Sequence, residues 1–110
     1  MFPSAFSYHR ASSVEEAVRL LASNPDAKIL AGGHSLLPAM KLRLATPPAL
    51  IDIGRIAGLR GIRVNSDGSI VIGALTTYHD LMDSAELRQG YPIIAETANV
   101  VGDPQVRARG

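Results

Sequence analysis

The chain of 110 residues contains no cysteine. Disulfide bonds, thiolate metal sites, iron–sulfur ligation and cysteine nucleophiles are therefore excluded within these residues, and the cytoplasm is the expected location. Residues 1–10 lack the basic start and apolar core of a secretory signal. No apolar run approaches the ~20 residues that a membrane-spanning helix needs, so no membrane span is expected.

A strong excess of either charge is also missing. The sequence has 11 lysine and arginine residues against 10 aspartate and glutamate residues, which gives a net charge of +1. This balance does not favour binding to nucleic acid or to an acidic membrane surface. Apolar residues make up 46% of the sequence, a content typical of a small globular domain rather than of a disordered chain.

Residues 6–53 show the pattern of a small parallel sheet. Ser12 and Ser13 each stand three residues before a glutamate, Glu15 or Glu16, and this doubled capping box predicts the start of a helix. Thr46-Pro47-Pro48 is expected to end a second helix. The pattern predicts strand, helix, strand, helix and strand over residues 6–9, 12–24, 28–31, 35–44 and 49–53.

The second half of the chain has a different character. Residues 61–65 and 69–73 alternate around Ser66-Asp67-Gly68, which predicts a β-hairpin. Helices are expected to start at Thr77 and at Tyr91, and Asp103-Pro104 is interpreted as a turn. The fold class is therefore α+β, with lobes of residues 1–56 and 57–110. The last residues bring no closing element, so we expect the chain to be part of a longer protein.

The segment 29–43 carries the strongest functional signal. An apolar strand is followed by Gly32 and Gly33, which permit positive φ and close approach of a ligand. Ser35 stands at a helix N-cap, and the free N–H groups after it favour a phosphate or pyrophosphate. The same residues suit an ordinary strand-to-helix connection. The glycine spacing matches neither a Rossmann fingerprint nor a P-loop.

The remaining candidate side chains give little support for catalysis or metal binding. His34 lies inside the glycine turn, where it either contacts a ligand or faces solvent, and no local partner makes it a general base. His79, Asp80 and Asp83 have ligand chemistry, but they fit the first turns of an exposed helix. We expect no catalytic residue and no metal site in this chain.

Residues 31–44, Ala-Gly-Gly-His-Ser-Leu-Leu-Pro-Ala-Met-Lys-Leu-Arg-Leu, closely resemble the FAD-binding medium subunit of molybdenum hydroxylases, in particular the carbon monoxide dehydrogenase type within the xanthine dehydrogenase family. Further family landmarks lie at residues 6–10, 50–53, 71–79, 91–97 and 102–110. The resemblance implies an FAD-binding domain of the vanillyl-alcohol-oxidase or p-cresol-methylhydroxylase type. Its small βαβαβ lobe would be followed by the start of a mixed α+β lobe.

The resemblance also implies which residues hold FAD. The first FAD loop would donate backbone N–H groups to the pyrophosphate, with apolar residues flanking it and another residue against the flavin. A second loop, Thr-Ile-Gly-Gly, is expected just beyond Gly110. The implied loop residues are Gly32, Gly33, His34, Ser35 and Leu36, the flanking residues are Leu30, Ala31 and Leu37, and the flavin contact is Val101.

The function implied by the resemblance is electron relay. Substrate would be oxidised at a molybdenum centre in a large subunit, and electrons would cross iron–sulfur clusters in a small subunit to reach FAD in this one. No side chain of this chain needs to act as an acid or a base. Two alternatives stay open: a flavin-free binding or scaffold module of the same fold, and a domain that binds another dinucleotide.

Overall fold

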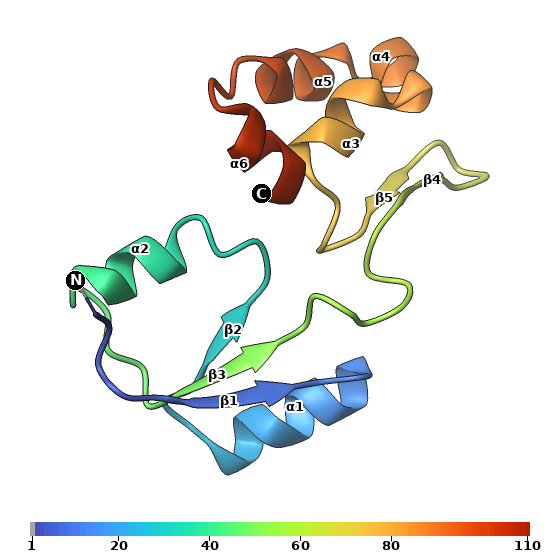
Figure 1. Cartoon of the computed structure of the whole chain (residues 1–110). Helices are drawn as coiled ribbons and strands as arrows, with labels where there is room; N and C mark the ends of the chain where they lie inside the picture. The colour runs from blue at the N-terminus through green and yellow to red at the C-terminus, as the bar shows by residue number, and fades with distance from the viewer. Residues whose placement is uncertain (1) are drawn as a thin grey trace. The chain divides into compact units, whose positions relative to one another are not determined.

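The computed structural model describes residues 2–110 and divides the chain into two compact units (Figure 1). The first unit ends at Ala57 and the second runs from Gly58 to Gly110. The first holds a parallel three-stranded sheet, and the second holds an antiparallel hairpin and four helices. The predicted α+β class is confirmed. Across the described residues, no helix has the length and apolar character needed to cross a lipid bilayer.

The sheet of the first unit is built around its last strand. Strands β1 (Ser7–Arg10), β2 (Lys28–Leu30) and β3 (Ala49–Asp52) are parallel and lie in the order β1-β3-β2. Central strand β3 is buried, since Leu50 and Ile51 are 1% and 0% exposed. An apolar run of this length is typical of a central parallel strand, so β3 organises the core of this unit.

Helix α1 (Val14–Ser23) begins at the predicted capping residues. The Glu16 N–H donates to Ser13 Oγ at 3.1 Å, and Ser12 Oγ donates to Glu16 Oε2 at 2.8 Å. These bonds satisfy an N–H group that the first helical turn leaves free. The predicted helix start is confirmed. The helix that connects β1 to β2 therefore begins where local capping residues in the sequence place it.

Helix α2 (Leu36–Lys41) is shorter than the sequence predicts. Its end is set by Arg43, which takes the left-handed conformation with φ 57°. The Leu44 N–H donates to Ala39 O at 2.8 Å, and the Arg43 N–H donates to Met40 O at 3.0 Å. These two bonds form a Schellman motif. The helix therefore ends before Thr46-Pro47-Pro48, and the predicted extension to Leu44 is wrong.

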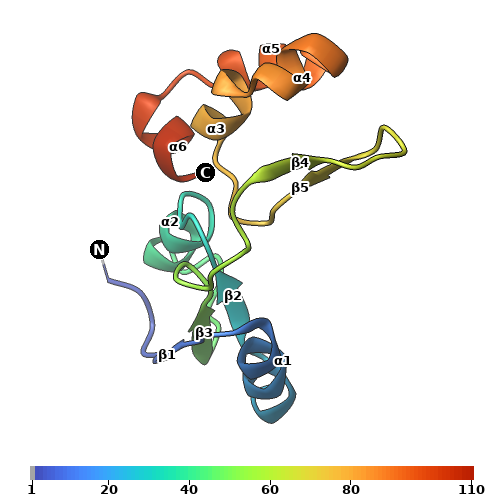
Figure 2. The ribbon, with the colours of Figure 1, turned by 90° about the vertical axis from the view of Figure 1, so that its right-hand side faces the viewer.

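The second unit begins with the predicted hairpin. Strands β4 (Ile62–Val64) and β5 (Ile70–Ile72) are antiparallel (Figure 2). Gly68 takes φ 89° in the connecting turn, and Asp67 Oδ1 accepts from the Ser69 N–H at 2.9 Å. Both features are those of a tight hairpin connection, so the hairpin prediction is confirmed.

Helices fill the rest of the second unit. The expected helices α3 (Tyr78–Asp83) and α5 (Pro92–Asn99) are present, and two more helices, α4 (Ala85–Gly90) and α6 (Pro104–Arg109), were not predicted. The interpretation of Asp103-Pro104 as a turn is wrong. Asp103 Oδ1 accepts from the Gln105 N–H at 2.8 Å, and Pro104 occupies the first helical position. An N-cap aspartate followed by proline starts a helix.

Candidate functional site

The candidate site is the loop that joins β2 to α2. It leaves the carboxyl edge of the parallel sheet, which is where ligands bind in sheets of this kind. Gly33 takes φ 82°. A Cβ atom on Gly33 would lie 2.9 Å from Leu37 Cδ1. Of the two glycines that permit positive φ, Gly33 is the one that adopts the left-handed backbone.

The loop presents backbone donors. The Ala39 N–H donates to Ser35 O at 3.1 Å, and Pro38 has no N–H. Within residues 2–110, no hydrogen bond is found from the N–H groups of residues 32–35, and residues 34 and 35 lie in a hydrogen-bonded turn that leads into α2. Ser35 is the N-cap as predicted, but its side chain accepts no capping bond. The donor set therefore comes from the loop backbone, and it suits a phosphate group.

The residues predicted to hold the cofactor fall into two groups. Those of the loop are consecutive in the first unit, and they range from half-buried to exposed. His34 is exposed. Val101 belongs to the second unit, where it is half-buried and donates its N–H to Ala98 O at 3.2 Å. Residues 30–37 thus run from the end of β2 through the loop into the first turn of α2, and Val101 follows the C-cap of α5.

Asp52 at the end of β3 was missed by the sequence analysis. Its carboxylate accepts from the Tyr8 hydroxyl and, at 2.8 Å, from the Gly54 N–H. Burial opposes ionisation, but these two bonds and the charges of Arg10 and Arg55 hold the pKa of Asp52 below its usual value. Asp52 thus ties β1 to the turn after β3. An aspartate at the end of a buried strand is the sequence signal that could have revealed it.

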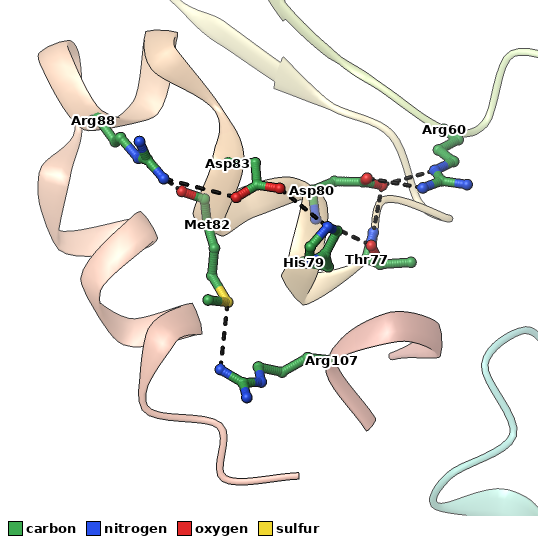
Figure 3. Close-up of polar contacts among 8 residues, drawn as sticks. All are labelled: Arg60, Thr77, His79, Asp80, Met82, Asp83, Arg88 and Arg107. Carbon is green, nitrogen blue, oxygen red and sulfur yellow. Dashed lines mark hydrogen bonds and ion pairs between the residues drawn. The ribbon is translucent and has the colours of Figure 1, made fainter. Parts of the chain in front are cut away.

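The second unit contains a polar cluster that spans the hairpin approach and α3 (Figure 3). Arg60 Nε lies 2.7 Å from Asp80 Oδ2, and Arg60 Nη2 lies 2.8 Å from Asp80 Oδ1. Asp80 also accepts from the Thr77 N–H at 3.1 Å, while Thr77 Oγ1 accepts from the Asp80 N–H at 3.1 Å. Arg60 first, and then Thr77, hold the pKa of Asp80 far below its usual value, against the opposing effect of burial.

A second set of charges lies further along α3. His79 Nε2 is 3.0 Å from Asp83 Oδ2, and Arg88 Nη2 is 3.7 Å from Asp83 Oδ1. Arg88 Nε donates to the Met82 carbonyl oxygen at 2.9 Å (Figure 3). Among residues 2–110 there is no group of three or more acidic or histidine side chains placed to hold a metal ion. The arrangement pairs charges and caps helices.

Asp80 gives a prediction for pH. A lowered folded-state pKa means that ionised Asp80 stabilises the fold above its unfolded pKa of about 3.9, and this contribution is lost as pH falls. We expect Asp80→Asn to lower the urea midpoint of unfolding at neutral pH. We also expect that midpoint to fall less steeply in the variant as the pH is lowered. Urea unfolding between neutral and acid pH measures both effects. Asp26→Asn, at an exposed turn, is the control. If the urea midpoint of Asp80→Asn fell with pH as steeply as that of the unmodified protein, the stabilising role of ionised Asp80 would be contradicted.

The sequence matches, over residues 4–110, the family described as the FAD binding domain in molybdopterin dehydrogenase. The chain therefore belongs to this family, and the resemblance seen in the sequence is confirmed. It is 54% identical over 111 residues to the carbon monoxide dehydrogenase medium chain of Hydrogenophaga pseudoflava, covering 100% of this chain and 38% of that relative.

Two further comparisons agree. The chain is 48% identical over 111 residues to the 6-hydroxypseudooxynicotine dehydrogenase complex subunit alpha of Paenarthrobacter nicotinovorans, covering 100% of this chain and 37% of that relative. It matches a solved chain of Hydrogenophaga pseudoflava carbon monoxide dehydrogenase that lacks the Mo-pyranopterin moiety of the molybdenum cofactor. That match has a TM-score of 0.94 and 54% identity, and it covers 100% of this chain and 38% of the other. The chain thus spans a little over a third of these relatives.

Proposed function

We propose that the chain is part of the FAD-binding subunit of a molybdenum-containing hydroxylase or dehydrogenase. In this role it helps to relay electrons from iron–sulfur clusters through FAD to an acceptor. The observation that carries the proposal is the match of residues 4–110 to a family of FAD-binding domains. The loop after β2 supports it, because its backbone offers donors of the kind that a pyrophosphate requires.

We assign the first FAD loop to residues 32–36, with their N–H groups as the donors to the pyrophosphate. Leu30, Ala31 and Leu37 flank this loop, and Val101 contacts the flavin. Gly33 keeps the backbone open, because its left-handed φ disfavours any residue with a Cβ. FAD, when bound, supplies the redox chemistry. The role of this chain is to bind and orient the cofactor.

The proposed domain type is that of vanillyl-alcohol oxidase and p-cresol methylhydroxylase. Residues 1–56 form its small lobe, and residues 57–110 begin its mixed α+β lobe. The proposed location is the cytoplasm. We propose a molybdenum-binding large subunit and an iron–sulfur small subunit as partners. The relatives named for carbon monoxide and for 6-hydroxypseudooxynicotine act on unlike compounds, so we assign substrate recognition to another subunit.

The test is the cofactor content of the protein as its host cell makes it. We expect the purified protein to show flavin absorption and to release stoichiometric FAD on denaturation. A protein without flavin would instead favour a binding or scaffold module of this fold. Release of a different dinucleotide, identified by its mass, would favour the remaining alternative. Either result would overturn the proposed function.

A further inference from the structure

We infer that the turn after α2 docks another protein chain, one that offers an apolar surface rimmed by carboxylates. This docking turn consists of Leu42, Arg43 and Leu44 together with Phe2, whose carbonyl oxygen accepts from Arg43 Nε at 3.2 Å. Figure 1 shows the start of the chain beside the end of α2. The inference rests on the proposed function, which supplies other subunits as the class of partner.

The backbone of Arg43 is the first observation. With φ 57° and both Schellman bonds, this residue fills a position that usually belongs to glycine. A side chain in the left-handed conformation is unfavourable, and strain of this kind persists where a side chain serves a purpose that offsets it. The hydrogen bond to Phe2 is one such purpose. It ties the backbone of Phe2, an apolar residue, to the turn.

The exposure of the turn is the second observation. Phe2 is 81% exposed, Leu42 is 55% exposed and Leu44 is 79% exposed. Two leucines on either side of a strained arginine, with a phenylalanine tied to it, gather apolar surface in one place. Exposed apolar surface beside polar residues is typical of a protein interaction site, and arginine is enriched in such sites.

Charge identifies the partner. Between Asp26 and Asp52 the sequence has no acidic residue, while Lys41 and Arg43 lie at the docking turn. Among the described residues, neither of these cations forms a salt bridge. Acidic side chains around an apolar surface would complement this turn. A symmetric contact between two copies is disfavoured, because it would place the same cations against each other.

The experiment uses the protein as its host cell makes it, co-expressed with the molybdenum-binding and iron–sulfur subunits. Leu42→Glu combined with Leu44→Glu places like charges against the acidic rim. We expect at least ~100-fold weaker association on size-exclusion chromatography and in affinity titration, as for the loss of a central interface contact. Val18→Glu is the matched control, since Val18 is 60% exposed on α1 of the same unit. It should associate normally.

Arg43→Gly separates docking from stability. Glycine relieves the left-handed strain, so the variant is expected to melt at a higher temperature than the unmodified protein. The same change removes the cation and the bond to Phe2, and association is expected to weaken about tenfold. A structural role alone would not raise stability while lowering affinity.

Each outcome decides. Association unchanged in the double variant or in Arg43→Gly would overturn the inference. The inference would also be overturned if the double variant lost only its association with other copies of itself. It would be overturned as well if the double variant unfolded at a markedly lower temperature, because the turn would then be covered by the protein's own chain. Flavin content is measured on the same samples. If the double variant lost association and the unmodified protein contained no flavin, the inference about the docking turn would stand. Only the proposed function would then be rejected.

Discussion

Gly33→Val is expected to remove most of the bound flavin and to weaken FAD binding by about 100-fold, while the protein stays folded. Gly33 has φ 82°, a conformation that a β-branched residue rarely adopts. Valine would turn the backbone away and misplace the N–H groups that we assign to the pyrophosphate. The loss of two charge-assisted hydrogen bonds at about 1.5 kcal/mol each corresponds to this loss of affinity.

The matched control is Gly68→Val in the hairpin turn. Gly68 has a similar φ of 89°, and a Cβ atom there would meet nothing within 4 Å. The control therefore carries the same backbone strain at a residue that is not part of the loop. Flavin content of both purified variants decides the matter. If Gly33→Val keeps its full flavin content, or if Gly68→Val loses as much flavin, the assigned loop is wrong.

The second large effect is expected from Gly73→Ala, which should destabilise the second unit by about 3 kcal/mol or more. A Cβ atom on Gly73 would lie 2.2 Å from Leu59 O and 2.7 Å from Leu59 C. These are backbone atoms, so the conflict cannot be relieved by a side-chain rotation. The Leu75 N–H donates to the same Leu59 oxygen at 2.8 Å, and the Gly73 N–H donates to Gly61 O at 2.9 Å.

Gly90→Ala is the control for this prediction. Gly90 ends α4, and a Cβ atom there would meet nothing within 4 Å. Alanine in a helix is more favourable than glycine by up to about 1 kcal/mol, so this variant should be neutral or more stable. Urea unfolding of both variants measures the difference. A free energy of unfolding for Gly73→Ala within ~1 kcal/mol of the unmodified protein would contradict the close approach.

Local signals in the sequence predicted much of the fold. The capping of α1 by Ser13 and the box of Thr77 with Asp80 involve residues three apart, so a short window contains the whole cause. The buried strand β3 was found by its apolar run. Helix α4 was missed because six residues carry too little periodicity, although Ser84 caps it through the Leu87 N–H at 3.2 Å.

The same distinction applies to the candidate site. Residues 30–37 are continuous in the chain, so the glycines of the loop and its proximity to a strand end could be recognised from the sequence. Arg60 and Asp80 are 20 residues apart, and their pairing depends on how the hairpin returns to α3. The left-handed Arg43 was hidden for another reason. An arginine in the sequence does not indicate a left-handed conformation, and the helix predicted over residues 35–44 included this position.

Competition between ligands tests the central claim, that the loop after β2 binds the pyrophosphate of FAD. The measurement is the displacement of FAD from the purified protein by ADP and by riboflavin at equal concentrations. Released FAD is detected by its fluorescence in the ADP experiment and by its mass in the riboflavin experiment. ADP carries a pyrophosphate and riboflavin carries none. We expect ADP to displace FAD and riboflavin to leave it bound. Displacement by riboflavin without displacement by ADP would contradict the claim.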